Sequence, residues 1–102
     1  MKTFKDLEFK EHDVAKSAKI AIKRGIDMSD YVDAKQAKIT FDNGKSLSVI
    51  FGECFYSNGI DTYEAMELSS DNDPKGYLTE QEVTEYMMFL QSVEIKDNAW
   101  KQ

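Results

Sequence analysis

The carboxylates between residues 71 and 82 are the side chains whose order most suggests chemistry. Asp71 and Asp73 precede Gly76 and Tyr77, and Glu82 closes the segment. Calcium loops place their oxygen ligands in this order: side-chain carboxylates, a glycine at the sharp turn, a backbone carbonyl and a final bidentate glutamate. One function that the sequence allows is therefore a calcium-binding module that uses Asp71, Asp73 and Glu82.

The same segment departs from the EF-hand loop that it resembles. Lys75 stands where a further oxygen ligand is expected and would place a positive charge beside the cation, and Pro74 stiffens the turn before it. Thr79 and Glu82 have the spacing of a helix capping box, which explains the closing glutamate without a metal. We therefore favour a strand-to-helix turn with Gly76 at positive φ, and we expect no metal and no cofactor.

Other groups that could catalyse a reaction are isolated in the sequence. His12 and Cys54 are the single histidine and the single cysteine, and neither has a metal-ligand or catalytic partner at a useful spacing. Carboxylates are so numerous that no spacing identifies an acid and its base, and neither a phosphate-binding loop nor a dinucleotide fingerprint occurs. The sequence therefore predicts a protein that is not an enzyme.

The elements that must position these groups are organised around a β-hairpin at residues 37–52. Apolar residues alternate with polar ones on both sides of Asn43 and Gly44, which is the pattern of two strands with one buried face. The Asn-Gly pair tolerates positive φ at both central positions, so we expect a type I′ turn. A hairpin alone is marginally stable, and the remaining chain must cover its apolar face.

A helix is predicted over residues 13–24, with Asp13 as its N-cap and Gly25 as its stop. The side opposite its apolar positions is a basic face. This face consists of Lys16, Lys19, Lys23 and Arg24. It is either a solvated surface near the C-terminal end of the helix dipole or a docking surface for an acidic partner, such as a second copy of the chain. With a second copy as the partner, the chain would be a homodimer with a structural or assembly function.

Three further segments complete the predicted fold. Residues 4–9 alternate weakly and could form an edge strand, and residues 62–68 are expected to form a third antiparallel strand. The best helix start is at Thr79, where Leu78 and Val83 add a hydrophobic staple to the capping box. The apolar stripe of this helix comprises Val83, Tyr86, Met87, Phe89, Leu90 and Val93.

These elements predict an α+β fold in one domain, residues 1–102. We expect a three- or four-stranded antiparallel β-meander at residues 37–69, covered by a C-terminal helix at residues 79–95. An additional N-terminal helix lies in an insertion at residues 13–36.

The net charge of −6 limits the partners that the chain can bind. Nucleic-acid-binding proteins normally carry a basic footprint, so direct binding to nucleic acid is not expected. A single cysteine and the lack of a long apolar run predict a cytoplasmic protein without a membrane span. Carboxylates and aromatic residues after the hairpin could instead enter a basic protein groove, as a nucleic-acid mimic would. The residues predicted to bind a protein are Phe55, Tyr56, Asp61, Glu64 and Glu67.

Three stretches resemble a group of small uncharacterised proteins of bacteriophages and prophages. They are FKDLEFKEH at 4–12, FDNGKSLSVIFGE at 41–53 and GYLTEQEV at 76–83. The resemblance covers residues 3–12 and 37–91, whereas residues 14–36 are extra in this chain. It implies a short N-terminal strand, a meander around an Asn-Gly turn and a final helix, and it carries over no catalytic residue. It also implies a phage accessory protein in the host cytoplasm, where small acidic proteins often block host factors such as CRISPR effectors and restriction enzymes.

Overall fold

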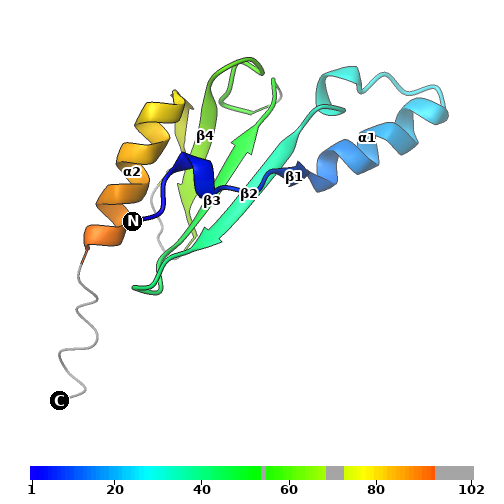
Figure 1. Cartoon of the computed structure of the whole chain (residues 1–102). Coiled ribbons are helices and arrows are strands. Elements are labelled where there is room, and N and C mark those ends of the chain that lie inside the picture. The colour runs from blue at the N-terminus through cyan, green and yellow to red at the C-terminus, as the bar shows by residue number, and fades with distance from the viewer. Residues whose placement is uncertain (54, 69–72, 94–102) are drawn as a thin grey trace.

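The computed structural model describes residues 1–53, 55–68 and 73–93, which form two helices beside one antiparallel sheet (Figure 1). The strand order is β1-β2-β3-β4-β5, so each strand pairs with its neighbours in the chain. The predicted α+β meander is confirmed, with five strands where three or four were expected. The strands are β1 (Lys10–Glu11), β2 (Lys35–Thr40), β3 (Ser46–Phe51), β4 (Tyr63–Glu67) and β5 (Lys75–Leu78).

The strands β2 and β3 form the predicted hairpin in continuous register. The turn between them is not type I′, because Gly44 has a positive φ of 87° but Asn43 does not. The N–H of Phe41 donates to the carbonyl of Lys45 at 2.8 Å, and the N–H of Gly44 donates to the carbonyl of Phe41 at 2.9 Å. A longer loop that ends in a left-handed glycine therefore closes the hairpin.

Asn43 acts on the C-terminal helix, α2 (Glu80–Ser92), through its side chain. Its amide nitrogen donates to the carbonyls of Leu90 at 2.8 Å and Val93 at 3.1 Å, while its amide oxygen accepts the N–H of Lys45 at 3.1 Å. The last carbonyls of a helix lack partners within the helix. Asn43 donates to two carbonyls at this end of the helix, and it thereby fixes the hairpin tip to the end of α2.

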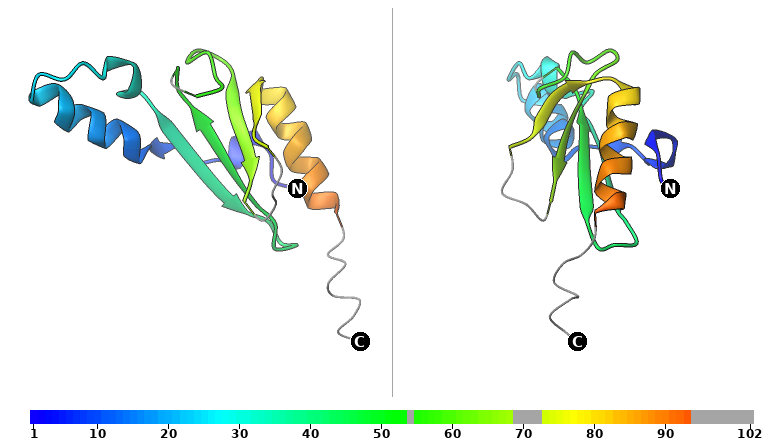
Figure 2. Two further views of the ribbon diagram at one scale, coloured as in Figure 1. Left: turned by 180° about the vertical axis from the view of Figure 1, so that it is seen from behind. Right: turned by 90° about the vertical axis from the view of Figure 1, so that its left-hand side faces the viewer.

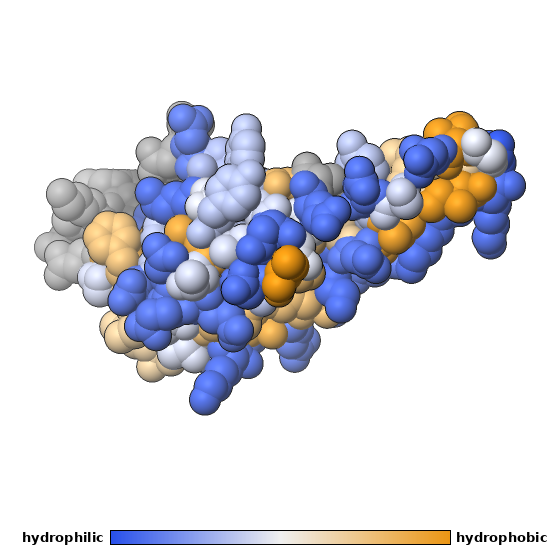
Figure 3. Space-filling model, turned by 90° about the horizontal axis from the view of Figure 1, so that it is seen from above, coloured by the Kyte–Doolittle hydropathy of each residue, from blue (hydrophilic) through white to orange (hydrophobic). Residues whose placement is uncertain are grey.

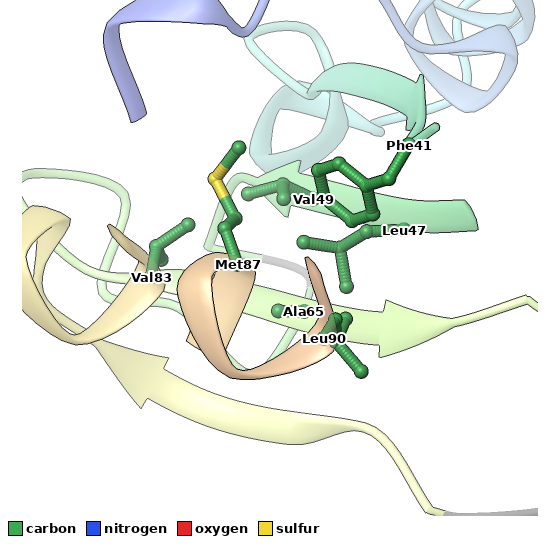
Figure 4. Packing of buried hydrophobic residues seen from close by; sticks show 7 residues of the cluster. All are labelled: Phe41, Leu47, Val49, Ala65, Val83, Met87 and Leu90. Carbon is green, nitrogen blue, oxygen red and sulfur yellow. The ribbon is translucent and has the colours of Figure 1, made fainter. Parts of the chain in front are cut away.

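One face of the sheet is covered by α2, and the hydrophobic core lies between them (Figure 4). Buried side chains from three strand or hairpin segments meet a stripe on the helix. The core consists of Phe41, Leu47, Val49, Ala65, Val83, Met87 and Leu90. The helix stripe is centred on residues spaced by three or four positions, as expected for a helix that rests on a sheet.

The start of α2 has the predicted capping box. The N–H of Glu82 donates to Oγ1 of Thr79 at 3.2 Å, and the N–H of Thr79 donates to Oε1 of Glu82 at 3.0 Å. The prediction that Phe89 packs on the sheet is wrong, because the helix turns its side chain to solvent, where it is 62% exposed. The predicted last turn of the helix, residues 94 and 95, lies outside the described residues.

The N-terminal segment packs against α2 and does not form the predicted edge strand. Phe4–Asp6 is a 3-10 helix, η1, and strand pairing begins only at β1. The N–H of Phe4 donates to Oγ1 of Thr84 at 3.1 Å. The N–H of Lys2 donates to Oε1 of Gln91 at 2.8 Å, and Nε2 of Gln91 donates to the carbonyl of Lys2 at 2.7 Å. These bonds hold the N-terminus beside α2 (Figure 1).

The N-terminal helix α1 (Asp13–Lys23) projects from the sheet and gives the molecule its elongated shape, 59 × 27 × 22 Å (Figure 2). It packs against a 3-10 helix, η2 (Ser29–Tyr31), and its buried residues are Ala15 and Ala18. We call residues 13–34 the arm. Neither helix of the described chain is long and apolar enough to cross a membrane.

The N-cap of α1 is His12, and not Asp13 as predicted. The Nδ1 atom of His12 accepts the N–H of Val14 at 3.0 Å, and Asp13 is the first helical residue. Gly25 follows the helix with a φ of 85°, which agrees with its predicted role as a stop.

Candidate protein-binding site

The face of the sheet opposite α2 carries the candidate site, and we call it the open face. In β4, Ala65 and Glu67 are buried on the core side. Successive strand residues point to opposite faces, so Glu64 and Met66 lie on the open face. Ile50 of β3 pairs with Glu64 and shares this face. The larger apolar side chain of β4, Met66, is therefore turned away from the helix and is only half-buried.

A β-bulge brings a tyrosine to the open face. Gly76 and Tyr77 of β5 lie opposite the single residue Glu64 of β4, between the two paired positions of this ladder. Tyr77 has a φ of 56° and is the one non-glycine residue with positive φ in the described chain. The prediction that Gly76 takes this conformation is therefore wrong. In the bulge, Tyr77 has the left-handed backbone conformation, and its side chain is 60% exposed.

The loop after β3 packs Tyr56 against the bulge. A Cβ atom on Gly76 would lie 2.5 Å from Cβ of Tyr56, so this close approach requires glycine. The N–H of Tyr77 donates to the Tyr56 carbonyl at 2.8 Å, and the N–H of Tyr56 donates to Oε1 of Glu64 at 3.1 Å. The two tyrosine rings lie 6.4 Å apart, and Tyr56 is 59% exposed. We call Tyr56, Glu64 and Tyr77 the tyrosine patch.

The loop that presents Tyr56 is fixed by its own hydrogen bonds. Oδ1 of Asn58 accepts the N–H groups of Ile60, Asp61 and Thr62 at 2.9 to 3.1 Å. Oγ of Ser57 donates to the carbonyl of Thr62 at 2.6 Å. Such side-chain bonds replace the strand ladder in this segment, so Tyr56 projects from an ordered support.

Two of the five residues predicted to bind a protein, Tyr56 and Glu64, lie together in this patch. Asp61 is exposed in the same loop and accepts a hydrogen bond from the amide of Asn58 at 2.7 Å. Phe55 is half-buried and points toward the base of the arm, where its ring lies 5.1 Å from that of His12. Phe55 therefore joins the loop to the arm and does not contribute to the patch.

Glu67 lies on the core side of the sheet and is only 6% exposed. Its Oε1 atom is 3.1 Å from Nζ of Lys45, in an ion pair at the edge of the core. Burial, and then the charge of Glu67, raise the pKa of Tyr86 on α2 above its usual value. These contacts give Glu67 a structural role, and the predicted binding residue is not part of the open face.

The calcium-type segment adopts a different structure from the loop that it resembles. Residues 75–78 form strand β5, and the carboxylate of Glu82 bonds to the N–H of Thr79. Nζ of Lys75 lies 5.4 Å from the centre of the Tyr86 ring. Asp73 is exposed, and Asp71 lies outside the described residues. Among the residues that are described, no group of three or more His, Cys, Asp or Glu side chains could hold a metal ion. Cys54 is also outside the described part.

The basic face lies on the arm, away from the tyrosine patch. Lys19 forms an ion pair with Glu11, and Nζ of Lys16 is 3.9 Å from Oδ1 of Asp13. Lys23 and Arg24 are exposed at the far end of α1. The structure therefore places the predicted basic face in solvent.

Tyr77 is the member of the patch that sequence reasoning missed. In the calcium interpretation it supplied only a backbone carbonyl. The one signal in the sequence is the preceding glycine, Gly76, which can mark a close approach of two backbones. The partner in that approach, Tyr56, is distant in sequence and could not be named.

No family model, no curated protein and no solved structure matches this chain. The geometry of the open face is therefore the basis for a functional assignment.

Proposed function

We propose that this chain is a non-enzymatic protein-binding domain that holds a basic partner on its tyrosine patch. The observation that supports this most strongly is the backbone of Tyr77. A left-handed conformation costs about 1 to 2 kcal/mol for a residue with a Cβ atom, and the exposed ring of Tyr77 does not recover this cost in the core. Strained residues of this kind concentrate at functional sites.

The chemistry of the patch suits arginine-rich protein surfaces. Oε1 of Glu64 accepts the N–H of Tyr56, whose exposed ring lies 6.4 Å from the exposed ring of Tyr77. Guanidinium groups stack on aromatic rings and pair with carboxylates, and tyrosine is enriched among residues that dominate binding energy. Glu53 and Asp61 add exposed carboxylates to the same end of the sheet. The net charge of −6 would also accelerate association with a basic partner.

The partner class that best fits this chemistry is a nucleic-acid-processing or defence protein of a bacterial host. Such a protein has a basic groove that an acidic domain can occupy in place of nucleic acid. The resemblance to phage accessory proteins supports the same partner, and the domain would act as an inhibitor in the host cytoplasm. CRISPR effectors and restriction enzymes are the examples to test first.

The test is affinity capture from bacterial lysate with three forms of the full chain: wild type, Tyr77→Ala and the control Ile26→Ala. Ile26 is exposed on the arm, so its loss changes apolar surface away from the patch. A protein captured by wild type and control is then purified and titrated calorimetrically. We expect Tyr77→Ala to weaken its binding by about tenfold or more, and added salt to weaken the wild-type complex. Equal affinity of wild type and Tyr77→Ala for every captured protein would contradict the proposal.

A further inference from the structure

The solvent side of α1 combines cations with an exposed aliphatic side chain. Lys16, Ile20, Lys23 and Arg24 recur at the spacing that places side chains on one face of a helix. Ile20 is 56% exposed, whereas the fully buried residues of α1 are the smaller Ala15 and Ala18. Figure 3 shows apolar side chains at the surface among hydrophilic ones at this end of the molecule. The larger aliphatic groups of the arm are therefore available to a partner.

The solvent side of α2 carries a carboxylate and two exposed apolar side chains at the same spacing. Gln81, Glu85, Met88 and Phe89 follow the register of the α1 stripe, position for position. Phe89 and Met88 are exposed beside the carboxylate of Glu85. The helix carries three acidic residues and no basic one, whereas α1 with Arg24 carries four cations and the single acid Asp13.

The two helices lie at opposite ends of the molecule, whose longest dimension is 59 Å (Figures 1 and 2). One chain cannot bring its own α1 to its own α2. Two copies that lie side by side in opposite directions would bring each α1 to the α2 of the other copy. Such a twofold arrangement makes the same contact between α1 and α2 twice and closes as a dimer.

We propose that this chain forms a reciprocal homodimer in which the Lys16, Ile20, Lys23 and Arg24 stripe of one copy packs on the Gln81, Glu85, Met88 and Phe89 stripe of the other. The proposal is independent of the tyrosine patch, which lies on the open face of the sheet. A second copy is favoured over an anionic membrane, because the arm also carries the acids Asp27, Asp30 and Asp33 and the whole chain is acidic.

The test is sedimentation equilibrium of the full chain over a range of concentrations, at low and high salt. We expect a dimer of the 11.7 kDa chain whose dissociation constant rises with salt. The charge-reversed variants K23E/R24E and Q81K/E85K should each raise the dissociation constant by about tenfold or more, because each brings like charges together in its own homodimer. Mixing the two variants should restore the dimer, since both contacts then pair opposite charges.

A matched control moves the same charge change to β2, as K35E/K38E, and should dimerise like the wild type. Circular dichroism checks that each variant is folded. Recovery of the dimer in the mixture is a second check, because only folded variants can pair. A monomeric wild type would overturn the proposal, as would a mixture that stays monomeric. A wild-type chain that stays monomeric while it binds vesicles of phosphatidylcholine and phosphatidylserine would assign the arm to a membrane surface instead. Growth beyond the dimer would overturn the twofold arrangement.

Discussion

At the scale of single residues, the bulge in β5 separates two effects of Tyr77 that a substitution can measure independently. The ring of Tyr77 is exposed beside Tyr56, and its backbone is held at a φ of 56°. Glycine populates this conformation without a steric cost, whereas alanine keeps the cost and removes the ring.

We expect Tyr77→Gly to be more stable than Tyr77→Ala by about 1 kcal/mol, because glycine relieves the left-handed strain. Both variants should lose binding of a basic partner to the same extent, because both lack the ring. Urea unfolding measures the first effect, and calorimetric titration with the captured partner measures the second. A Tyr77→Gly chain that is less stable than Tyr77→Ala would show that this backbone is not strained.

Tyr63 and Tyr86 should make the folded state sensitive to alkaline pH. The pKa of Tyr63 is raised above its usual value of 10.0 by burial, then by the charges of Glu80 and Asp61, and that of Tyr86 is raised by burial, then by Glu67. Because each tyrosine has a higher pKa in the folded chain than in the unfolded chain, its neutral form stabilises the folded state. This stabilisation is fully present below pH 10 and is lost as pH rises through the folded pKa.

We therefore expect Tyr63→Phe and Tyr86→Phe to make the free energy of unfolding fall less steeply above pH 10. Urea unfolding at a series of pH values checks this, and the absorbance of tyrosinate follows the titration directly. Tyr31→Phe serves as the control. If all three variants kept the wild-type slope, the alkaline sensitivity would have to come from other groups.

At the scale of elements, the capping box of α2 explains why a calcium-like sequence ends in a glutamate. Oγ1 of Thr79 and the carboxylate of Glu82 each accept a backbone N–H at the start of the helix. Glutamine can replace glutamate in a capping box, because its amide oxygen accepts the same hydrogen bond. A bidentate calcium ligand has no such substitute.

Thr79→Ala should therefore lower the free energy of unfolding by about 1 kcal/mol, while Thr79→Ser should change it little. Glu82→Gln should keep most of the stability of the wild type, and added Ca²⁺ should not shift the melting temperature. Chemical denaturation and thermal unfolding with and without Ca²⁺ measure these effects. A calcium-dependent rise in melting temperature that Glu82→Gln abolishes would restore the calcium interpretation.

Local signals predicted some elements well and others not at all. The hairpin and the start of α2 follow from patterns within a few residues: alternation, a turn pair and a capping box. Strand β5 was missed because it is short and its pairing with β4 contains a bulge. Asn43 was correctly placed in a turn, but its bonds to α2 depend on tertiary structure.

The candidate site was only partly predictable for the same reason. Residue type alone indicates Tyr56 and Glu64, and the fold brings them together. The side chains of β4 alternate between two faces of the sheet, and the sequence does not indicate which face is the core side. The burial of Glu67 therefore does not follow from the sequence. Its pairing with Lys45 depends on the register of the hairpin.

At the scale of the whole molecule, the arm lies outside the hydrophobic core that joins α2 to the sheet. The helix α1 has only 11 residues, and isolated helices of this length are marginal in water. Its contacts are mainly with η2, so it can open without disruption of the core.

We expect amide hydrogens of α1 to exchange faster than those of β3 in dilute, monomeric protein, with α1 opening well below the free energy of global unfolding. Hydrogen exchange followed by mass spectrometry measures the two segments in one sample. If the reciprocal dimer forms, protection of α1 should rise with protein concentration in the wild type and not in K23E/R24E. Equal protection of α1 and β3 at every concentration would contradict an arm that opens alone.

The neighbour-to-neighbour strand order has a consequence for how quickly the chain reaches its native state. The pairings among β2, β3, β4 and β5 can each form by closing the loop between consecutive strands, whereas β1 pairs with β2 across the whole arm, so the sheet can assemble progressively from the hairpin outward. The bonds between Lys2 and Gln91 and between Phe4 and Thr84 span almost the whole chain and should form after the main barrier. Thr84→Ala should then accelerate unfolding and leave the refolding rate unchanged in stopped-flow measurements.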